Sequence, residues 1–184
     1  MKSNLANMVL SLTVLTVIVG AALAWVNNLT AEPIAQAKAQ ALADALSQVL
    51  PPFDNNPAET ATRADGLKLY SATMSGEAAG FAVESYSDDG FGGRFEIVVG
   101  FDAKDAVYGY RVLSHAETPG LGAKMDTWFA TMPHDIKGTS IPLAVKADGG
   151  EIDAITGATI SSRAFLGAVN RARKALETYK NGLK

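Results

Sequence analysis

The sequence predicts an α+β domain attached to one amino-terminal transmembrane helix. Three observations support this fold class. An apolar run without a charged residue extends from Leu5 to Val26, strand-like runs separated by turn residues occupy the middle of the chain, and helix-forming runs lie on both sides of them. Strands that are flanked by helices at both ends, rather than alternating with them, favour an antiparallel sheet flanked by helices.

The first element is a membrane anchor. As a helix, the run from Leu5 to Val26 would be about 33 Å long, at about 1.5 Å per residue, and would match a hydrocarbon core about 30 Å thick. Trp25 near its end suits a membrane interface. Lys2 is the single charged residue among residues 1–30, and this favours an amino terminus in the cytoplasm with the domain on the other side.

A cleaved signal peptide is the alternative interpretation of this segment, because Ala22-Leu23-Ala24 has the small-x-small form of a cleavage site. The apolar run is, however, longer than the core of a typical signal peptide. We therefore expect an uncleaved anchor over residues 1–30 and one extracytoplasmic domain over residues 31–184.

The domain should begin with a helix over residues 33–50, which are rich in alanine. Pro33 suits the first turn of a helix, and Pro51-Pro52 ends it. Residues 53–66 are polar and are expected to form a loop. The face of this helix that is expected to be apolar consists of Ile34, Leu42, Leu46 and Val49.

Four strands should follow the loop, and short turns rich in aspartate and glycine separate them. Connections of this kind favour an antiparallel meander, in which each strand pairs with the next. The predicted strands cover residues 66–74, 79–87, 93–101 and 106–114.

The last third of the chain mixes loops with short elements. We expect a glycine-rich loop at 117–122, a short helix over 124–132, a strand over 141–146, a short strand or turn over 151–156 and a final helix over 159–179. Ile160, Ala164, Ala168, Ala172 and Leu176 repeat at intervals of four along the final helix and predict its buried face. Four cations are expected away from that face or along its edges: Arg163, Arg171, Arg173 and Lys174.

Composition excludes several classes of function. The chain has no cysteine, which excludes thiolate-bound iron–sulfur clusters, cysteine-rich zinc sites, disulfides and cysteine nucleophiles. A redox role would therefore need an organic cofactor or a metal site without thiolates, and two histidines offer little for the latter. The formal charge of −3 and a pI near 5.4 disfavour a basic nucleic-acid binder, and no P-loop or GxGxxG fingerprint is present.

The segment from Asp153 to Ser162 carries the clearest signal of function. Thr156-Gly157-Ala158-Thr159 places hydroxyl side chains around a turn directly before the final helix. One interpretation is structural, with Thr156 or Thr159 as the N-cap residue. The other is functional, because a helix amino terminus offers unpaired N–H groups and a partial positive charge that favour a phosphate.

Asp153-x-x-Thr156-Gly157-Ala158-Thr159 resembles the motif at which flavin transferases attach FMN through its phosphate to threonine. That motif belongs to the FMN-binding domains of the Rnf and sodium-translocating NADH:quinone reductase complexes. A second match supports it, since the loop Glu117-Thr118-Pro119-Gly120-Leu121-Gly122 is similar to the loop beside the flavin ring in that family. The short chain resembles the G subunit of the Rnf complex more than the longer C subunit of the quinone reductase.

The resemblance implies a covalent phosphoester between FMN and Thr159. It also implies that the backbone of Gly120, Leu121 and Gly122 approaches the ring, with Leu121 and Thr118 as apolar and polar contacts. The expected cofactor-binding residues are Asp153, Thr156, Gly157, Ala158, Thr159, Glu117, Thr118, Gly120, Leu121 and Gly122. No catalytic residue and no metal ligand is expected.

Other residues have structural interpretations. His115 and Glu117 are spaced as a metal half-site without an evident third ligand, and His115 is better interpreted as a hydrogen-bonding residue near the loop. A hydrolase using Ser161 or Ser162 with His115 lacks the GxSxG elbow. Trp128 and Phe129 suit the core, although either could lie against the flavin. Lys146 suits a solvated strand end, although it could face the phosphate.

These observations predict an electron carrier and not a stand-alone enzyme. By resemblance, it would belong to an ion-translocating complex that couples electron flow between ferredoxin and NAD to sodium or proton movement across the bacterial inner membrane. Its expected partners are other subunits of the complex, a flavin transferase and membrane lipid, and no nucleic acid. The alternatives are a C subunit of the quinone reductase and a membrane-anchored scaffold without a cofactor.

Overall fold

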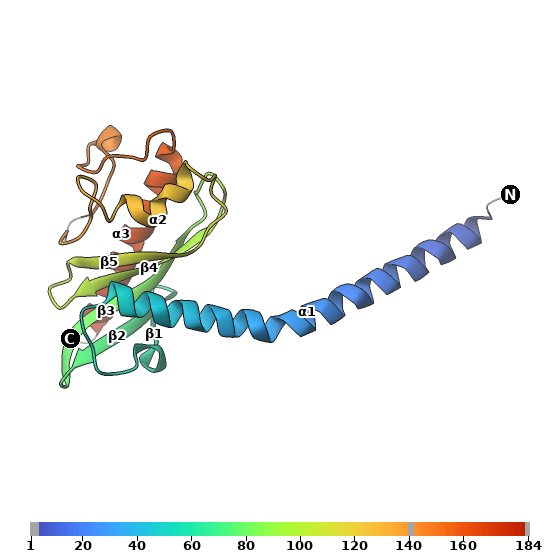
Figure 1. Ribbon diagram of the computed structural model, residues 1–184, viewed down its shortest axis with the longest axis horizontal. Helices are drawn as coiled ribbons and strands as arrows, with labels where there is room; N and C mark the ends of the chain where they lie inside the picture. Colours follow the sequence, from blue (N-terminus) through green and yellow to red (C-terminus); the bar gives the residue numbers. More distant parts are fainter. Residues whose placement is uncertain (1–3, 140–141, 183–184) are drawn as a thin grey trace. The chain divides into compact units, whose positions relative to one another are not determined.

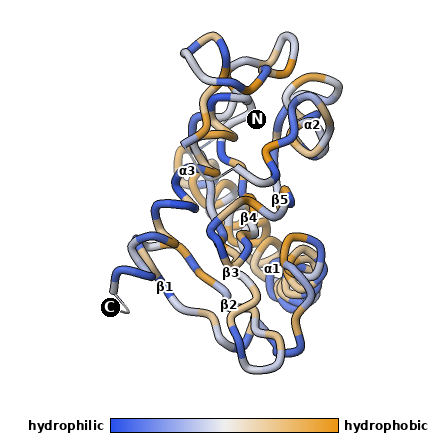
Figure 2. Tube along the Cα trace, turned by 90° about the vertical axis from the view of Figure 1, so that its left-hand side faces the viewer, coloured by the Kyte–Doolittle hydropathy of each residue, from blue (hydrophilic) through white to orange (hydrophobic). Residues whose placement is uncertain are grey.

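The amino-terminal segment forms one uninterrupted helix, α1, Leu5–Val49 (Figure 1). Residues 4–41 are exposed throughout, and α1 is long and apolar enough to cross a membrane. Figure 2 shows α1 nearly end-on, with both hydrophobic and hydrophilic colours on its coils. The expectation of a separate helix starting at Pro33 was wrong, since Pro33 lies inside α1. A proline removes one backbone hydrogen bond, and the alanine-rich turn that follows continues the helix.

The computed structural model of the chain describes residues 4–139 and 142–182. The described residues separate into two compact units, one ending at Ala41 and the other beginning at Leu42. The second unit holds the sheet, the remaining helices and the last two turns of α1.

The second unit is built on an antiparallel sheet in the order β1-β2-β3-β4-β5 (Figure 1). The strands are β1 Thr62–Ala64, β2 Leu67–Met74, β3 Glu77–Ser87, β4 Phe95–Asp102 and β5 Val107–Ser114. The predicted meander is confirmed, because each strand pairs with the next in the chain. The three-residue strand β1 was not predicted, because its segment is polar. It forms by pairing with the edge of β2.

One face of the sheet packs against the final helix, α3, Thr159–Gly182. Its predicted face is confirmed at Ala164, Ala168, Ala172 and Leu176, which are buried with Phe81, Val83 and other strand residues. Ile160 is exposed because it precedes the part of α3 that contacts the sheet. Arg173 differs from its prediction: it is buried, and its Nη2 donates a hydrogen bond to the Thr139 carbonyl at 2.7 Å.

The other face of the sheet packs against the last turns of α1. Leu46, Val49 and Leu50 are buried with Tyr70 and Val98. The approach is close, because a Cβ on Gly100 would lie 1.7 Å from the Val49 carbonyl oxygen. The apolar face predicted for this helix is confirmed at Leu46 and Val49, whereas Ile34 is exposed.

Between β5 and α3, the helices that the described residues form are short, and they lie at the end of the sheet where α3 begins (Figure 1). The predicted helix over 124–132 is reduced to the 3₁₀ turn η2, Gly122–Lys124, and the helix α2, Met125–Trp128. The strand predicted over 141–146 is wrong for the described residues: Val145 forms an isolated bridge with Ile152, and the 3₁₀ turn η3, Lys146–Asp148, follows. Ile141 lies outside the described residues.

Candidate functional site

The first turn of α3 presents Thr159 at its start. Gly157 has a φ of +77°, which glycine adopts without strain, and the Ala158 N–H donates to the Ile155 carbonyl at 2.9 Å to close the turn. Ala158 precedes the helix and has no side-chain acceptor, so neither Thr156 nor Thr159 occupies the N-cap position. The α3 start is therefore left without the side-chain cap that one sequence interpretation proposed.

The first three backbone N–H groups of α3 belong to Thr159, Ile160 and Ser161. None of them has an acceptor within the ranges 4–139 and 142–182, while the next N–H, of Ser162, donates to the Ala158 carbonyl at 3.0 Å. Unpaired donors at a helix amino terminus, together with its partial positive charge, favour a phosphate. Thr159 is partly exposed beside them, so its hydroxyl is accessible to a modifying group.

Ser162 holds the turn before α3 in shape. Its buried hydroxyl accepts a hydrogen bond from the Ile155 N–H and donates one to the Ala158 carbonyl, both at 2.9 Å. These two bonds fix the backbone of residues 155–158 against the first turn of the helix. The role of Ser162 is thus structural, and its hydroxyl is not available as a nucleophile.

Glu117 joins three segments that are distant in the sequence. Its carboxylate is buried, with the residue only 5% exposed. Oε2 accepts a hydrogen bond from the Ser161 hydroxyl in α3 at 2.8 Å, and Oε1 accepts one from the Gly92 N–H in the β3–β4 loop at 3.2 Å. A buried carboxylate needs such donors, and here they connect the Glu117–Gly122 loop to the turn that carries Thr159.

Glycines surround this carboxylate because no side chain would fit. A Cβ on Gly122 would lie 2.2 Å from Glu117 Oε2, and one on Gly90 would lie 2.7 Å from Oε1. A Cβ on Gly92 would lie 2.2 Å from the Ala116 carbonyl oxygen. The predicted glycine loop is thus packed against Glu117, and the loop over 90–93, which the sequence interpretation did not include, is part of the same site. The Gly-Phe-Gly-Gly run was the signal that could have identified it.

The Glu117–Gly122 loop also contacts the turn before α3 directly. Leu121 Cδ2 would be 3.3 Å from a Cβ on Gly157, and the Leu121 side chain is 43% exposed. The Leu121 N–H donates to the Thr118 carbonyl at 3.1 Å, so this amide is paired within the loop. Gly120 is exposed and has a φ of +77°.

Asp153 lies in a separate cluster of polar and aromatic residues. Its Oδ2 accepts a hydrogen bond from Lys146 Nζ at 2.8 Å and lies 3.6 Å from His134 Nδ1. The hydrogen bond from Lys146 is the largest cause that lowers the pKa of Asp153. Trp128 stacks on His134 and donates its indole N–H to the Asp153 carbonyl at 3.0 Å. Lys146 therefore pairs with Asp153 and does not stand alone at a strand end.

His115 has the structural role that the sequence favoured. Its Nδ1 accepts a hydrogen bond from the Glu117 N–H at 3.2 Å, and its Nε2 lies 3.6 Å from Asp126 Oδ2. No group of three metal-ligating residues occurs in the part of the chain that the structure describes. The Ser161 hydroxyl donates its hydrogen bond to Glu117 and not to His115. The serine–histidine pair that a serine hydrolase needs is therefore not formed. Phe129 is fully buried against Phe165, as expected for a core residue.

Two family models match the chain. The family model described as FMN-binding domain matches residues 90–174, which include most of the β3–β4 loop, the Glu117–Gly122 loop and most of α3. The model described as RnfG N-terminal region matches residues 1–49, a range that contains α1.

Curated relatives cover most of the chain. It is 38% identical over 168 residues to the G subunit of the ion-translocating oxidoreductase complex of Shewanella loihica, a match that covers 82% of this chain and 79% of that protein. The proteins of the same name from Aliivibrio fischeri strain MJ11 and Pseudomonas aeruginosa strain UCBPP-PA14 are 36% and 32% identical, covering 84% and 87% of this chain and 82% and 83% of theirs. With an FMN-binding domain behind a helix able to span a membrane, the chain belongs to the family of G subunits of ion-translocating oxidoreductase complexes.

Proposed function

We propose that this chain is an electron-carrying subunit whose FMN is held by a phosphoester bond to Thr159. The observation that carries the proposal is the start of α3, where Thr159 is partly exposed and the first three backbone N–H groups have no acceptor among the described residues. Bound FMN would supply the electron chemistry. The residues of this chain would hold the phosphate, orient the ring and limit access of water.

The chemistry of attachment fits Thr159. Its Oγ1–H bond would be replaced by an O–P bond as an activated flavin nucleotide transfers its flavin-phosphoryl group, and the leaving group would depart with the proton. The product keeps one negative phosphate oxygen, which the N–H groups and the partial positive charge of α3 stabilise. The hydrogen bonds of Ser162 fix the backbone of the turn directly before Thr159.

The remaining motif residues would act around this attachment point. Thr156 and Gly157 are exposed on the turn, and Ala158 is buried beneath it. Asp153, with its Lys146 and His134 neighbours, would present a charged surface to the flavin transferase. Thr118, Gly120 and Leu121 would contact the ring, while Glu117 and Gly122 would hold that loop in place.

The placement in the cell follows from the anchor. We infer that residues 1–30 lie in the bacterial inner membrane and that residues 31–184 lie outside the cytoplasm, because Lys2 is the single charge at the amino-terminal end. A covalent tether would prevent loss of a soluble flavin there. The proposed partners are the other subunits of the oxidoreductase complex, with ferredoxin and NAD as the distant electron donor and acceptor.

The test is detection of covalent flavin on the denatured full chain after expression with a flavin transferase. We expect in-gel flavin fluorescence and a mass gain of one FMN on the wild type and on Thr156→Ala, and neither signal on Thr159→Ala. Signal on Thr159→Ala would contradict the attachment residue. If the wild-type chain shows no flavin fluorescence while the transferase modifies a control protein, the result would favour a scaffold without a cofactor.

A further inference from the structure

Three exposed apolar residues are sequence neighbours of residues that contact the Glu117 carboxylate. Phe91, Leu121 and Ile160 are 71%, 43% and 52% exposed. Each of the three directly precedes, in the sequence, a residue that contacts this carboxylate. The Gly92 N–H donates a hydrogen bond to Oε1, the Ser161 hydroxyl donates one to Oε2, and Gly122 is packed against Oε2. We refer to Phe91, Leu121 and Ile160 as the apolar rim.

The β3–β4 loop holds Phe91 in a defined position. The glycines on either side of it have no room for a side chain, since a Cβ on Gly90 would lie 2.4 Å from the Gly93 carbonyl oxygen and one on Gly92 would lie 2.2 Å from that of Ala116. Phe91 is thus the one large side chain in a tightly packed turn, and it projects into solvent. Ile160 borders a hollow of about 270 Å³ between α3 and the end of β3, which is also lined by Ser87, Asp89, Arg163, Ala164, Gly167 and Arg171.

Exposed apolar side chains gathered at one place mark a surface that is covered in the working protein. A planar aromatic ring suits this surface, because aromatic groups gain from offset or edge-to-face packing as well as from burial. Two observations favour a flavin ring as the occupant. The match to the FMN-binding domain begins at residue 90 and takes in all three rim residues, and Ile160 is next to Thr159, from which the ring would be tethered.

We propose that Phe91 packs against the isoalloxazine ring of FMN, with Leu121 and Ile160 completing the apolar surface beneath it. This assignment rests on the proposed attachment at Thr159 and adds a contact residue that neither the attachment motif nor the Glu117–Gly122 loop contains. Phe91 would shield the ring from water and restrict its motion on the tether.

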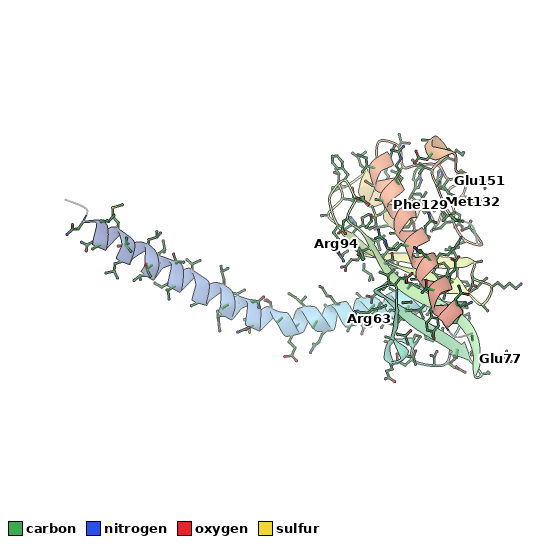
Figure 3. All side chains as sticks on the ribbon, turned by 180° about the vertical axis from the view of Figure 1, so that it is seen from behind. Arg63, Glu77, Arg94, Phe129, Met132 and Glu151 are labelled. Atoms are coloured by element: carbon green, nitrogen blue, oxygen red, sulfur yellow. The ribbon has the colours of Figure 1, made fainter. Side chains whose placement is uncertain are left out.

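The experiment uses the full chain in detergent micelles after expression with a flavin transferase. The variants are Phe91→Ala, Phe91→Tyr and Phe91→Trp, and the controls are Met74→Ala and Met74→Trp. Met74 is 47% exposed and pairs with Glu77 in the β2–β3 hairpin, which Figure 3 shows at the opposite end of the sheet from the loops that surround the start of α3. The readouts are the mass of attached FMN, quenching of flavin fluorescence by iodide, and fluorescence intensity.

We expect every variant to carry FMN. In Phe91→Ala, the ratio of flavin rings packed against the protein to rings exposed to solvent should fall roughly two- to tenfold, the range for loss of one aromatic contact. Iodide should therefore quench the flavin of Phe91→Ala more strongly than that of the wild type. Phe91→Tyr should protect the flavin from iodide as well as the wild type does. Phe91→Trp should dim the flavin, because an indole in contact quenches it by electron transfer, and Met74→Trp should not.

Two results would overturn the proposal while leaving covalent attachment intact. In one, loaded Phe91 variants match the wild type in both fluorescence readouts. In the other, Phe91→Ala leaves the flavin signals unchanged but reduces recovery of the other complex subunits, which would make the rim a protein interface. Absence of FMN from a wild-type chain exposed to active transferase would instead remove the attachment itself, and this assignment with it.

Discussion

Glu117 shows how one buried side chain can connect distant segments of a site. It was expected to bind the cofactor, and both of its carboxylate oxygens accept hydrogen bonds, from Ser161 and from Gly92. Because Glu117 is buried, these hydrogen bonds contribute to the stability of the fold. A donor left without a partner in the interior would bear the full free-energy cost of losing its contact with water. We interpret Glu117 as a positioning residue that sets the distance between the Glu117–Gly122 loop and Thr159.

Replacement of Glu117 by alanine should therefore destabilise the second unit by about 3 kcal/mol, since the buried Ser161 hydroxyl and the partly buried Gly92 N–H lose a charged acceptor. Glu117→Gln retains an acceptor oxygen and should cost less. Urea unfolding of the full chain in detergent, followed by Trp128 fluorescence in a Trp25→Phe background, measures the free energy. Glu151→Ala, at an exposed position, is the control. Equal stability of Glu117→Ala and the control would contradict this role.

Asp153 provides a prediction about pH. The Lys146 hydrogen bond lowers the pKa of Asp153, so the pair adds stability above the ordinary pKa of an aspartate and loses it as the pH falls through the lowered value. Lys146→Met should raise the pKa of Asp153 toward that of a free aspartate, which a carbon NMR titration of the carboxyl group measures. An unchanged titration would show that Lys146 does not hold this carboxylate.

At the level of elements, the sheet is enclosed by helices from both ends of the chain. The last turns of α1 approach the sheet so closely that only glycine fits at position 100. On the other face, α3 uses alanines at its contact positions, which brings the helix backbone near the strands. The positions of α1 and α3 against the sheet therefore depend on small residues.

Gly100→Ala should destabilise the second unit by about 3 kcal/mol, because the added methyl would overlap the Val49 carbonyl and the backbone has to move. Gly167→Ala is the matched control: Gly167 lies inside α3, and a Cβ there would meet no atom within 4 Å. That change should be neutral or stabilising by up to about 1 kcal/mol, since alanine favours helix. Thermal unfolding of the two variants compares them directly, and a larger loss for Gly167→Ala would contradict the packing described here.

For the whole molecule, the absence of cysteine permits a direct test of topology. Asn4→Cys and Glu151→Cys introduce single thiols at the start of α1 and in the second unit. In intact spheroplasts, a thiol reagent that does not cross membranes should label Glu151→Cys and should reach Asn4→Cys only after permeabilisation. The reverse pattern would place the domain in the cytoplasm.

Local patterns in the sequence were sufficient for several parts of this protein. The apolar run of α1, the alternating strands and the start of α3 at Thr159 each follow from periodicity, turn residues and length, which act over a few neighbouring residues. The same patterns were ambiguous at Pro33, which suits both the beginning and the interior of a helix. They also overestimated residues 142–146, where an apolar run makes only an isolated bridge.

The sequence by itself determined the class of fold, the helix able to span a membrane, the exclusion of thiolate chemistry and the motif at which we propose that FMN is attached. Only the tertiary structure decided what surrounds that motif. The carboxylate of Glu117 accepts hydrogen bonds from Ser161 and Gly92 across long stretches of chain, and the second of these bonds holds the loop that carries Phe91. Such contacts depend on how the sheet brings its loops together, a property that no local pattern of residues contains.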